Sequence, residues 1–275
     1  IQLLLDQAVG TNAAIGFDND ARGFKTLYSI SLDGNLTKKE LLSAESADVD
    51  SLVTIGRRQR VIGASYATEK RMVKYFDTSF HDLANALSNA LPGKPVVSFV
   101  GASEDERELL LITGSDVDPG MLYKFDRDTN RLNPLLPIRE MTEGRTLANM
   151  TPVTFPASDG TQIPGYLTLP LGSDGKNLPA IVMPHGGPSA RDEWGFDWLV
   201  QFFVARGYAV AQPNFRGSTG FGKNFISAGN LEWGRKMHDD LLDAVKGDRA
   251  LLERAVEESV RWAPTDPMFS RWVMR

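Results

Sequence analysis

Residues 180–222 read AIVMPHGGPSARDEWGFDWLVQFFVARGYAVAQPNFRGSTGFG, and this stretch decides the fold class of the second half of the chain. Ala180–Met183 is a continuous apolar run, which is typical of a strand buried on both faces of a parallel sheet. A helix with apolar residues at helical spacing follows, and Gly207 ends it. Tyr208–Gln212 is a second buried strand. The order strand, helix, strand predicts a right-handed parallel crossover in an α/β domain.

The segments that flank this stretch extend the same domain. Thr151–Pro156 and Gln162–Leu169 have strand composition and enclose Ser158-Asp159-Gly160. Asp-Gly supplies the positive φ angles of a tight turn, so the two strands should form a hairpin. A further helix is expected from about Leu231 to Val245.

The first 140 residues contain short strand-like runs separated by polar turns, and helical periodicity is mostly absent. The expected strands are Thr26–Ser31, Leu52–Ile55, Arg60–Tyr66, Met72–Phe76, Val96–Val100, Leu109–Thr113 and Met121–Phe125. One short amphipathic helix is predicted over His81–Leu91, with Leu83, Leu87 and Leu91 on one face. Propeller blades span about 40 to 50 residues, so this region has room for about three. An immunoglobulin-like sandwich fits the same pattern of strands.

A series of motifs in the second half resembles the prolyl oligopeptidase family, nearest to its acylaminoacyl-peptidase and dipeptidyl-aminopeptidase-like branch. The motifs are Asp159-Gly160, Tyr166–Pro170, His185-Gly186-Gly187-Pro188, Asn214-x-Arg216-Gly217-Ser218-Thr219-Gly220-x-Gly222, Trp233-Gly234 and Asp239-Asp240-Leu241. His-Gly-Gly alone is shared with esterases and lipases, whereas the whole series is more specific. Upstream, Ser115-Asp116, Pro119-Gly120 and Tyr123-x-Phe125-Asp126 resemble the last blade before the hydrolase domain.

The resemblance implies a mixed fold, in which a partial antiparallel β-propeller precedes the N-terminal part of an α/β-hydrolase domain. We expect about three blades over residues 1–140, the peptidase domain over 141–246, and a helical tail of uncertain origin over 247–275. The chain begins at Ile1 and not at Met, so we also expect it to be a piece of a longer protein.

The same resemblance implies roles for single residues in acyl transfer. An attacked carbonyl becomes an oxyanion that needs backbone N–H donors, and Gly187 is the candidate donor. The residues expected to shape the two loops are His185, Gly186, Pro188, Asn214, Arg216, Gly217, Gly220 and Gly222. His185 as a catalytic base is the less favoured alternative, because the base of this family comes from a loop late in the domain. A phosphate-binding P-loop is excluded, because no Lys-Ser/Thr follows Gly222 in the required order.

The catalytic serine, acid and base are predicted to be missing. No Gly-x-Ser-x-Gly elbow follows Val245, and the acid and base of this fold come after the serine in the chain. Ser65 lies in the nearest match, Gly63-Ala64-Ser65-Tyr66-Ala67, which lacks the second glycine. His238, Asp239 and Asp240 are interpreted as the solvated surface of a helix. The chain alone is therefore expected to be inactive.

The tail carries a second, shorter resemblance. Leu251–Pro264 is similar to the helix with a Glu-x-x-Arg pair in haem-thiolate cytochrome monooxygenases, with Glu258 and Arg261 as the pair. An amphipathic helix with an ordinary i, i+3 ion pair explains the sequence of this stretch equally well. Haem ligation through sulfur is excluded, because the chain contains no cysteine.

The composition of the chain argues against some classes of binding partner. A net charge of -5 gives no basic surface for nucleic acid, and there is no apolar run of the roughly 18 residues that a membrane helix needs. The lack of cysteine fits cytoplasm and periplasm equally. The resemblance implies a short-peptide substrate and a Ser-His-Asp mechanism without metal or cofactor in the complete enzyme. A non-catalytic peptide-binding module and an esterase remain alternatives, and the upstream blades favour a peptidase over an esterase.

Overall fold

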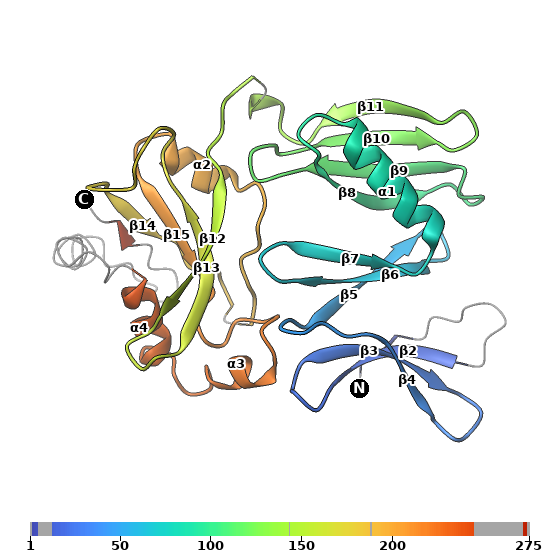
Figure 1. Cartoon of the computed structure of the whole chain (residues 1–275), viewed down its shortest axis with the longest axis horizontal. Coiled ribbons are helices and arrows are strands. Elements are labelled where there is room, and N and C mark those ends of the chain that lie inside the picture. Colours follow the sequence, from blue (N-terminus) through green and yellow to red (C-terminus); the bar gives the residue numbers. More distant parts are fainter. Residues whose placement is uncertain (1, 5–12, 143, 188, 245–271, 274–275) are drawn as a thin grey trace. The chain divides into compact units, whose positions relative to one another are not determined.

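The computed structural model describes residues 2–4, 13–142, 144–187, 189–244 and 272–273, and the chain divides into two compact units, Ile1–Arg145 and Thr146–Arg275. Figure 1 shows both in colours that follow the sequence. Among the described residues, no helix is long and apolar enough to cross a membrane.

The described part of the first unit contains three antiparallel sheets in which strands adjacent in the chain are neighbours. The first sheet has the order β1-β2-β3-β4, the second β5-β6-β7 and the third β11-β10-β9-β8 (Figure 1). The strands are β1 (Gln2–Leu4), β2 (Ala13–Asn19), β3 (Lys25–Ser31), β4 (Lys38–Leu42), β5 (Val49–Ile55), β6 (Arg60–Ala67), β7 (Arg71–Tyr75), β8 (Val96–Ala102), β9 (Glu108–Gly114), β10 (Met121–Asp126) and β11 (Arg131–Pro137). Such consecutive meanders are the building unit of a propeller.

Two apolar cores join these sheets in pairs. Phe17 and Leu27 of the first sheet pack with Val49 and Ala64 of the second. A larger core joins the second sheet to the third and to helix α1 (Thr78–Ala90). Its buried members are Ile55, Ile62, Phe80, Leu87, Val97, Phe99, Leu109, Leu111 and Phe125. The second sheet therefore takes part in both cores.

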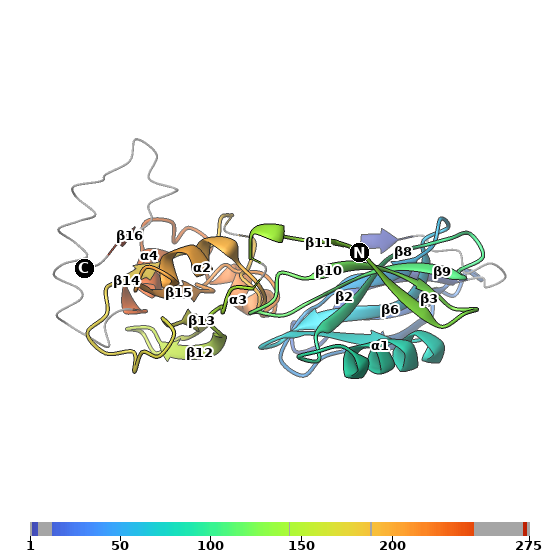
Figure 2. The same ribbon diagram turned by 90° about the horizontal axis from the view of Figure 1, so that it is seen from above.

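Helix α1 begins three residues before the predicted start at His81. Asp77 caps it by accepting a hydrogen bond from the backbone N–H of Ser79, which satisfies a donor that the first turn leaves open. The earlier start places Phe80 in the core, where its ring meets Phe99 edge-on with centroids 5.0 Å apart. Figure 2 shows α1 on one side of the strands of this unit.

Replacing Phe80 by alanine should destabilise the first unit by about 3–5 kcal/mol, because the cavity removes a fully buried ring from the larger core. Urea unfolding of wild type and variant measures the difference. Phe76→Ala is the matched control, since Phe76 is exposed. Equal shifts of the two midpoints would contradict this account of the core.

The second unit is built on one sheet with the strand order β12-β13-β15-β14-β16. Its strands are β12 (Met150–Pro156), β13 (Gln162–Thr168), β14 (Ala180–Val182), β15 (Ala209–Pro213) and β16 (Trp272–Val273). The predicted hairpin and the predicted parallel pair are confirmed: β12 and β13 are antiparallel, and Ala180 of β14 pairs with Ala209 of β15 in parallel. Helix α2 (Trp198–Val204) connects the parallel strands and buries Val200 and Val204 against Ile181 and Val210.

One helical prediction needs correction, and one helix was missed. The helix expected from Leu231 is α4 (Lys236–Asp243), because Leu231 and Gly234 have φ angles of +61° and +70° that a right-handed helix cannot include. A short helix that was not predicted, α3 (Lys223–Ser227), precedes it. The strands β1, β2, β4, β11 and β16 and the 3-10 turn Glu140–Thr142 were also not predicted. Strand β16 lies in the stretch 247–275 that was expected to be helical. The predicted helix over Leu251–Trp262, with Glu258 and Arg261, lies outside the described residues.

Candidate functional site

The loops that follow β14 and β15 lie together, because the two strands are parallel and adjacent and their carboxyl ends share one edge of the sheet. His185 of the first loop stacks on Phe215 of the second, with ring centroids 4.6 Å apart and an interplanar angle of 14°. The Nε2 atom of His185 is 2.8 Å from the Oγ atom of Ser218. These contacts fasten the His-Gly-Gly turn to the neighbouring loop.

His185 and Ser218 resemble a catalytic pair in their distance but not in their surroundings. Ser218 is 0% exposed and donates a 2.6 Å hydrogen bond to the carbonyl of Phe215. The Nδ1 atom of His185 is 2.8 Å from the carbonyl oxygen of Gly186, where a triad would place a carboxylate. Burial lowers the pKa of His185, which favours a neutral ring. Ser218 is inaccessible to a substrate, so the pair holds the turn and lacks the arrangement of a nucleophile and base.

Gly187 presents its backbone at the exposed end of this turn. Its φ of +126° lies in the region that favours glycine, and an added Cβ would lie 2.9 Å from the amide nitrogen of Ser189. The Gly187 N–H makes no hydrogen bond to any residue in the part of the chain that the structure describes. An exposed amide without an internal acceptor is what an oxyanion donor requires. Gly186 is also exposed, and Pro188 lies outside the described residues.

Asn214 fixes the segment that follows Gly187. Its side chain is buried, accepts a 2.8 Å hydrogen bond from the backbone N–H of Asp192 and donates one of 3.1 Å to the carbonyl of the same residue. The backbone N–H of Thr219 donates to the carbonyl of Ala190 at 2.9 Å. Hydrogen bonds therefore join the two loops at several positions along their length.

Arg216 joins three segments that are distant in the sequence. Its Nε atom and its backbone N–H donate to Oδ2 of Asp240 at 2.8 and 3.0 Å, and its Nη2 atom donates to Oδ1 at 2.6 Å. The same guanidinium donates to both oxygens of Asp159 at 2.8 and 3.1 Å. The turn between β12 and β13, the loop after β15 and helix α4 thus meet at one side chain. Arg216 also holds the pKa of Asp159 well below its ordinary value.

The interpretation of Asp240 as a solvated helix residue is wrong, since Asp240 is 0% exposed. Met237, Asp240 and Asp243 occupy one face of α4, and all three are buried. Asp243 accepts a hydrogen bond from the backbone N–H of Ser158. His238 and Asp239 are exposed, in agreement with the prediction. The spacing of Met237 and Asp240 was the available signal for an inward face.

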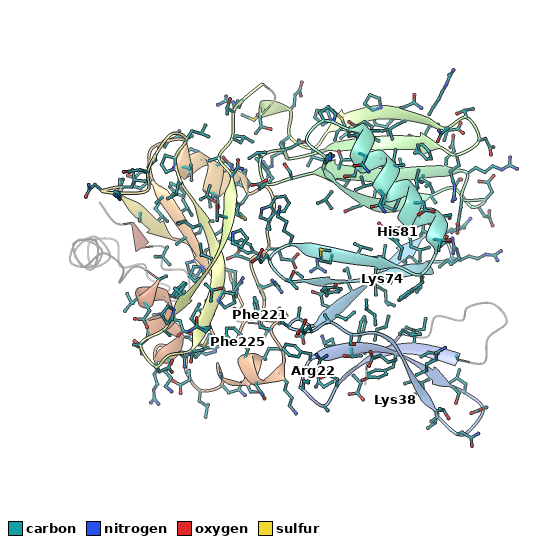
Figure 3. The ribbon with its side chains drawn as sticks, viewed as in Figure 1. Arg22, Lys38, Lys74, His81, Phe221 and Phe225 are labelled. Atoms are coloured by element: carbon teal, nitrogen blue, oxygen red, sulfur yellow. The ribbon has the colours of Figure 1, made fainter. Side chains whose placement is uncertain are left out.

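The glycines of the second loop adopt backbone conformations that other residues disfavour. Gly217, Gly220 and Gly222 have φ angles of +98°, +92° and +85°. At Gly220 an added Cβ would lie 2.3 Å from Nη1 of Arg191. The guanidinium of Arg191, a residue that the sequence analysis did not single out, lies 4.4 Å from the centroid of the Phe221 ring. Figure 3 labels Phe221 and its neighbour Phe225, whose ring centroids are 5.2 Å apart.

Ser65 is unsuited to act as a nucleophile. It lies within β6, is buried and accepts a 2.8 Å hydrogen bond from Arg71, whose guanidinium also donates to Asp50 at 2.7 Å. Within the described residues, no group of three or more His, Cys, Asp or Glu side chains is arranged to hold a metal ion.

Residues 194–252 match the model of the prolyl oligopeptidase family. The chain is 34% identical over 235 residues to dipeptidyl aminopeptidase BIII of Pseudoxanthomonas mexicana, covering 82% of this chain and 34% of that protein. It is 32% identical over 230 residues to dipeptidyl peptidase family member 6 of Caenorhabditis elegans, covering 76% of this chain and 31% of that protein. The comparisons support a relationship of this chain to the prolyl oligopeptidase family. The chain spans about a third of the length of these curated relatives.

Solved structures of prolyl oligopeptidase type share the fold. A puromycin-hydrolyzing peptidase of Mycobacterium tuberculosis aligns with a TM-score of 0.62 and 20% identity, covering 88% of this chain and 37% of that one. Dipeptidyl peptidase 4 of Porphyromonas gingivalis aligns with a TM-score of 0.60 and 15% identity, covering 89% of this chain and 34% of that one. The mixed fold of propeller and α/β-hydrolase is confirmed. An immunoglobulin-like sandwich is therefore the wrong alternative for the first unit.

Proposed function

We propose that this chain is part of a serine peptidase of the prolyl oligopeptidase family that hydrolyses short peptides through an acyl-enzyme. The single observation that supports this role best is the exposed Gly187 amide on a turn fastened by His185 and Ser218. Relatives are named as dipeptidyl peptidases, which fits a short peptide as the substrate. Seryl attack on the peptide carbonyl produces an oxyanion, and the Gly187 N–H stabilises that charge as it develops.

The described loops supply the oxyanion side of such a site but not its nucleophile. The 275-residue sequence contains no Gly-x-Ser-x-Gly elbow, and neither Ser65 nor Ser218 is accessible. The complete mechanism needs a serine, a histidine and an acid that this chain does not provide at matching positions. We therefore assign the nucleophile, base and acid to no residue of this chain.

We expect the chain alone to hydrolyse aminoacyl p-nitroanilides and p-nitrophenyl esters no faster than background, and to resist labelling by a serine-directed phosphonate. A full-length relative with the elbow is the positive control for labelling. Steady hydrolysis that the phosphonate abolishes would contradict this expectation. In that event Ser218→Ala and Ser65→Ala would identify which of the two buried hydroxyls had become reactive.

A second candidate function is peptide binding without cleavage, favoured by the exposed Gly187 amide in a sequence without a Gly-x-Ser-x-Gly elbow. Isothermal titration with short peptides distinguishes it. Micromolar binding that Gly187→Val weakens, with the peptide recovered intact, would support a binding module. An esterase is the third candidate, and comparing the two chromogenic substrates on a full-length enzyme separates it from a peptidase.

A further inference from the structure

A buried carboxyl and a buried carboxamide meet beneath the loop after β14, and the oxyanion site described above uses neither. The Gln212 side chain, on β15, donates a hydrogen bond to the carboxyl of Asp192. Gln212 is 3% exposed. Two oxygens of this pair, Oδ2 of Asp192 and Oε1 of Gln212, are buried and have no hydrogen-bond partner among the described residues. A buried oxygen without a donor is unfavourable, because it has lost its hydrogen bonds to water and gained none in the protein.

One proton would satisfy both oxygens. If Asp192 is neutral, its Oδ2–H donates to Oε1 of Gln212 while the amide nitrogen of Gln212 donates to the other carboxyl oxygen. The result is a planar ring with two hydrogen bonds between an acid and an amide. If Asp192 is ionised, both oxygens stay buried without a donor among the described residues.

The surroundings of Asp192 raise the pKa of its carboxyl on balance. Burial raises the pKa of Asp192 to about 7, and the carboxylate of Asp197, which caps α2, raises it as well. The hydrogen bond from Gln212 and the guanidinium of Arg191 oppose this effect. Arg191 itself stacks on Phe221 and lies within 3.9 Å of Glu193, so its charge is shared among several groups.

The backbone of Asp192 connects this pair to the loop that carries Gly187. Asn214 holds both the N–H and the carbonyl of Asp192, and Thr219 holds Ala190, three residues beyond Gly187. The Asp192 side chain is thus a third attachment of the same segment, and the only one of the three with an ionisable group.

We propose that Asp192 and Gln212 share a proton in a cyclic acid–amide pair, which acts as a pH-sensitive clasp on the loop after Gly187. Any effect on catalysis rests on the proposed peptidase function, but the pair itself is a property of the fold. Asp192 is a positioning residue, since it acts on Gly187 through the backbone of residues 189–192.

The sign of the pH dependence follows from the two states of the clasp. In the closed loop Asp192 keeps its proton up to about pH 7, whereas in an opened, hydrated loop the carboxyl loses it near its ordinary pKa of about 3.9. The clasp is therefore at full strength below about pH 4 and weakens as the pH rises towards 7. Between about pH 4 and pH 7 the equilibrium constant for opening of the loop should rise up to about tenfold per pH unit. Above pH 7 this constant should no longer change with pH.

The test uses the full chain and needs no catalytic activity. Amide hydrogen exchange of Thr219, corrected for the intrinsic exchange rate, should show an opening equilibrium that rises about tenfold per pH unit between pH 4 and 7. The carboxyl carbon of Asp192 should titrate near pH 7 in NMR spectra. Asp192→Asn preserves both hydrogen bonds without a titrating proton, so Thr219 protection should become independent of pH. Asp239→Asn, which removes an exposed carboxylate on α4, is the control and should leave the rise unchanged.

Two results would overturn the clasp. One is an Asp192 carboxyl that titrates near pH 4 with flat Thr219 protection; the other is a pH-dependent rise that survives in Asp192→Asn. If Asp192→Asn does not fold, the titration of the wild-type carboxyl decides alone. A failure of the peptidase proposal would show in the phosphonate labelling of a full-length relative and leave these exchange data unaffected.

Discussion

Replacing Gly187 by valine in a full-length enzyme that carries this loop should lower kcat about 100- to 1000-fold with little change in KM, the loss expected for one displaced oxyanion donor. Valine disfavours the φ of +126°, and its Cβ would collide with the amide nitrogen of Ser189. Both effects should move the backbone amide that we propose as an oxyanion donor. Steady-state kinetics with an aminoacyl p-nitroanilide measures the split between kcat and KM.

Gly186→Val is the matched control for this substitution. A Cβ at Gly186 meets no atom within 4 Å, and the residue is equally exposed. Its kcat should therefore fall far less than that of Gly187→Val. A Gly187 variant with raised KM and unchanged kcat would show that the turn binds substrate in the ground state, and the role assigned to its amide would then be wrong.

Replacing Arg216 by methionine should destabilise the second unit by about 3–5 kcal/mol, because Asp240 would keep a buried charge without its partner. The Arg216 side chain is 5% exposed and Asp240 is 0% exposed, so water screens this pair very little. Asp159 is 37% exposed, and losing its contact should contribute much less. Urea unfolding followed by the tryptophans of this unit gives the change in free energy.

The double variant Arg216→Met, Asp240→Leu separates the lost pair from general damage to the loop. Removing both charges should recover part of the stability, since an apolar pair of similar volume leaves no buried carboxylate without its partner. The rest stays lost, because the Arg216 backbone N–H no longer has Oδ2 of Asp240 as its acceptor. Arg206→Met, which changes an arginine bonded to the backbone of α2, should have a small effect. A double variant as unstable as the single one would mean that Arg216 acts mainly through its hydrogen bonds to Asp159.

The sequence predicted those parts of the fold whose signal is local. The apolar run Ala180–Met183 and the Asp159-Gly160 turn each carry their structure within a few residues, and both predictions are confirmed. Strand β4 (Lys38–Leu42) was missed because its charged residues face water on an edge, where the apolar alternation of a strand disappears.

The candidate site was predictable only in part, because its supports are long-range. The resemblance pointed to His185, Gly187 and Arg216, but the partners of Arg216 lie 24 and 57 residues away. A helix boundary placed five residues early hid the inward face that carries Asp240. Asp192 and Gln212 belong to no motif, and only the pairing of β13, β14 and β15 brings them together.

The two apolar cores of the first unit have a consequence for how it loses its structure. Among the described residues, each core joins neighbouring sheets, so the first and third sheets are coupled through the second. This is the arrangement of a linear array of repeats, in which cooperativity passes from neighbour to neighbour. The three-stranded sheet β5-β6-β7 therefore contributes to both cores. Local unfolding can begin at either outer sheet independently, whereas unfolding of the middle sheet disrupts both cores at once.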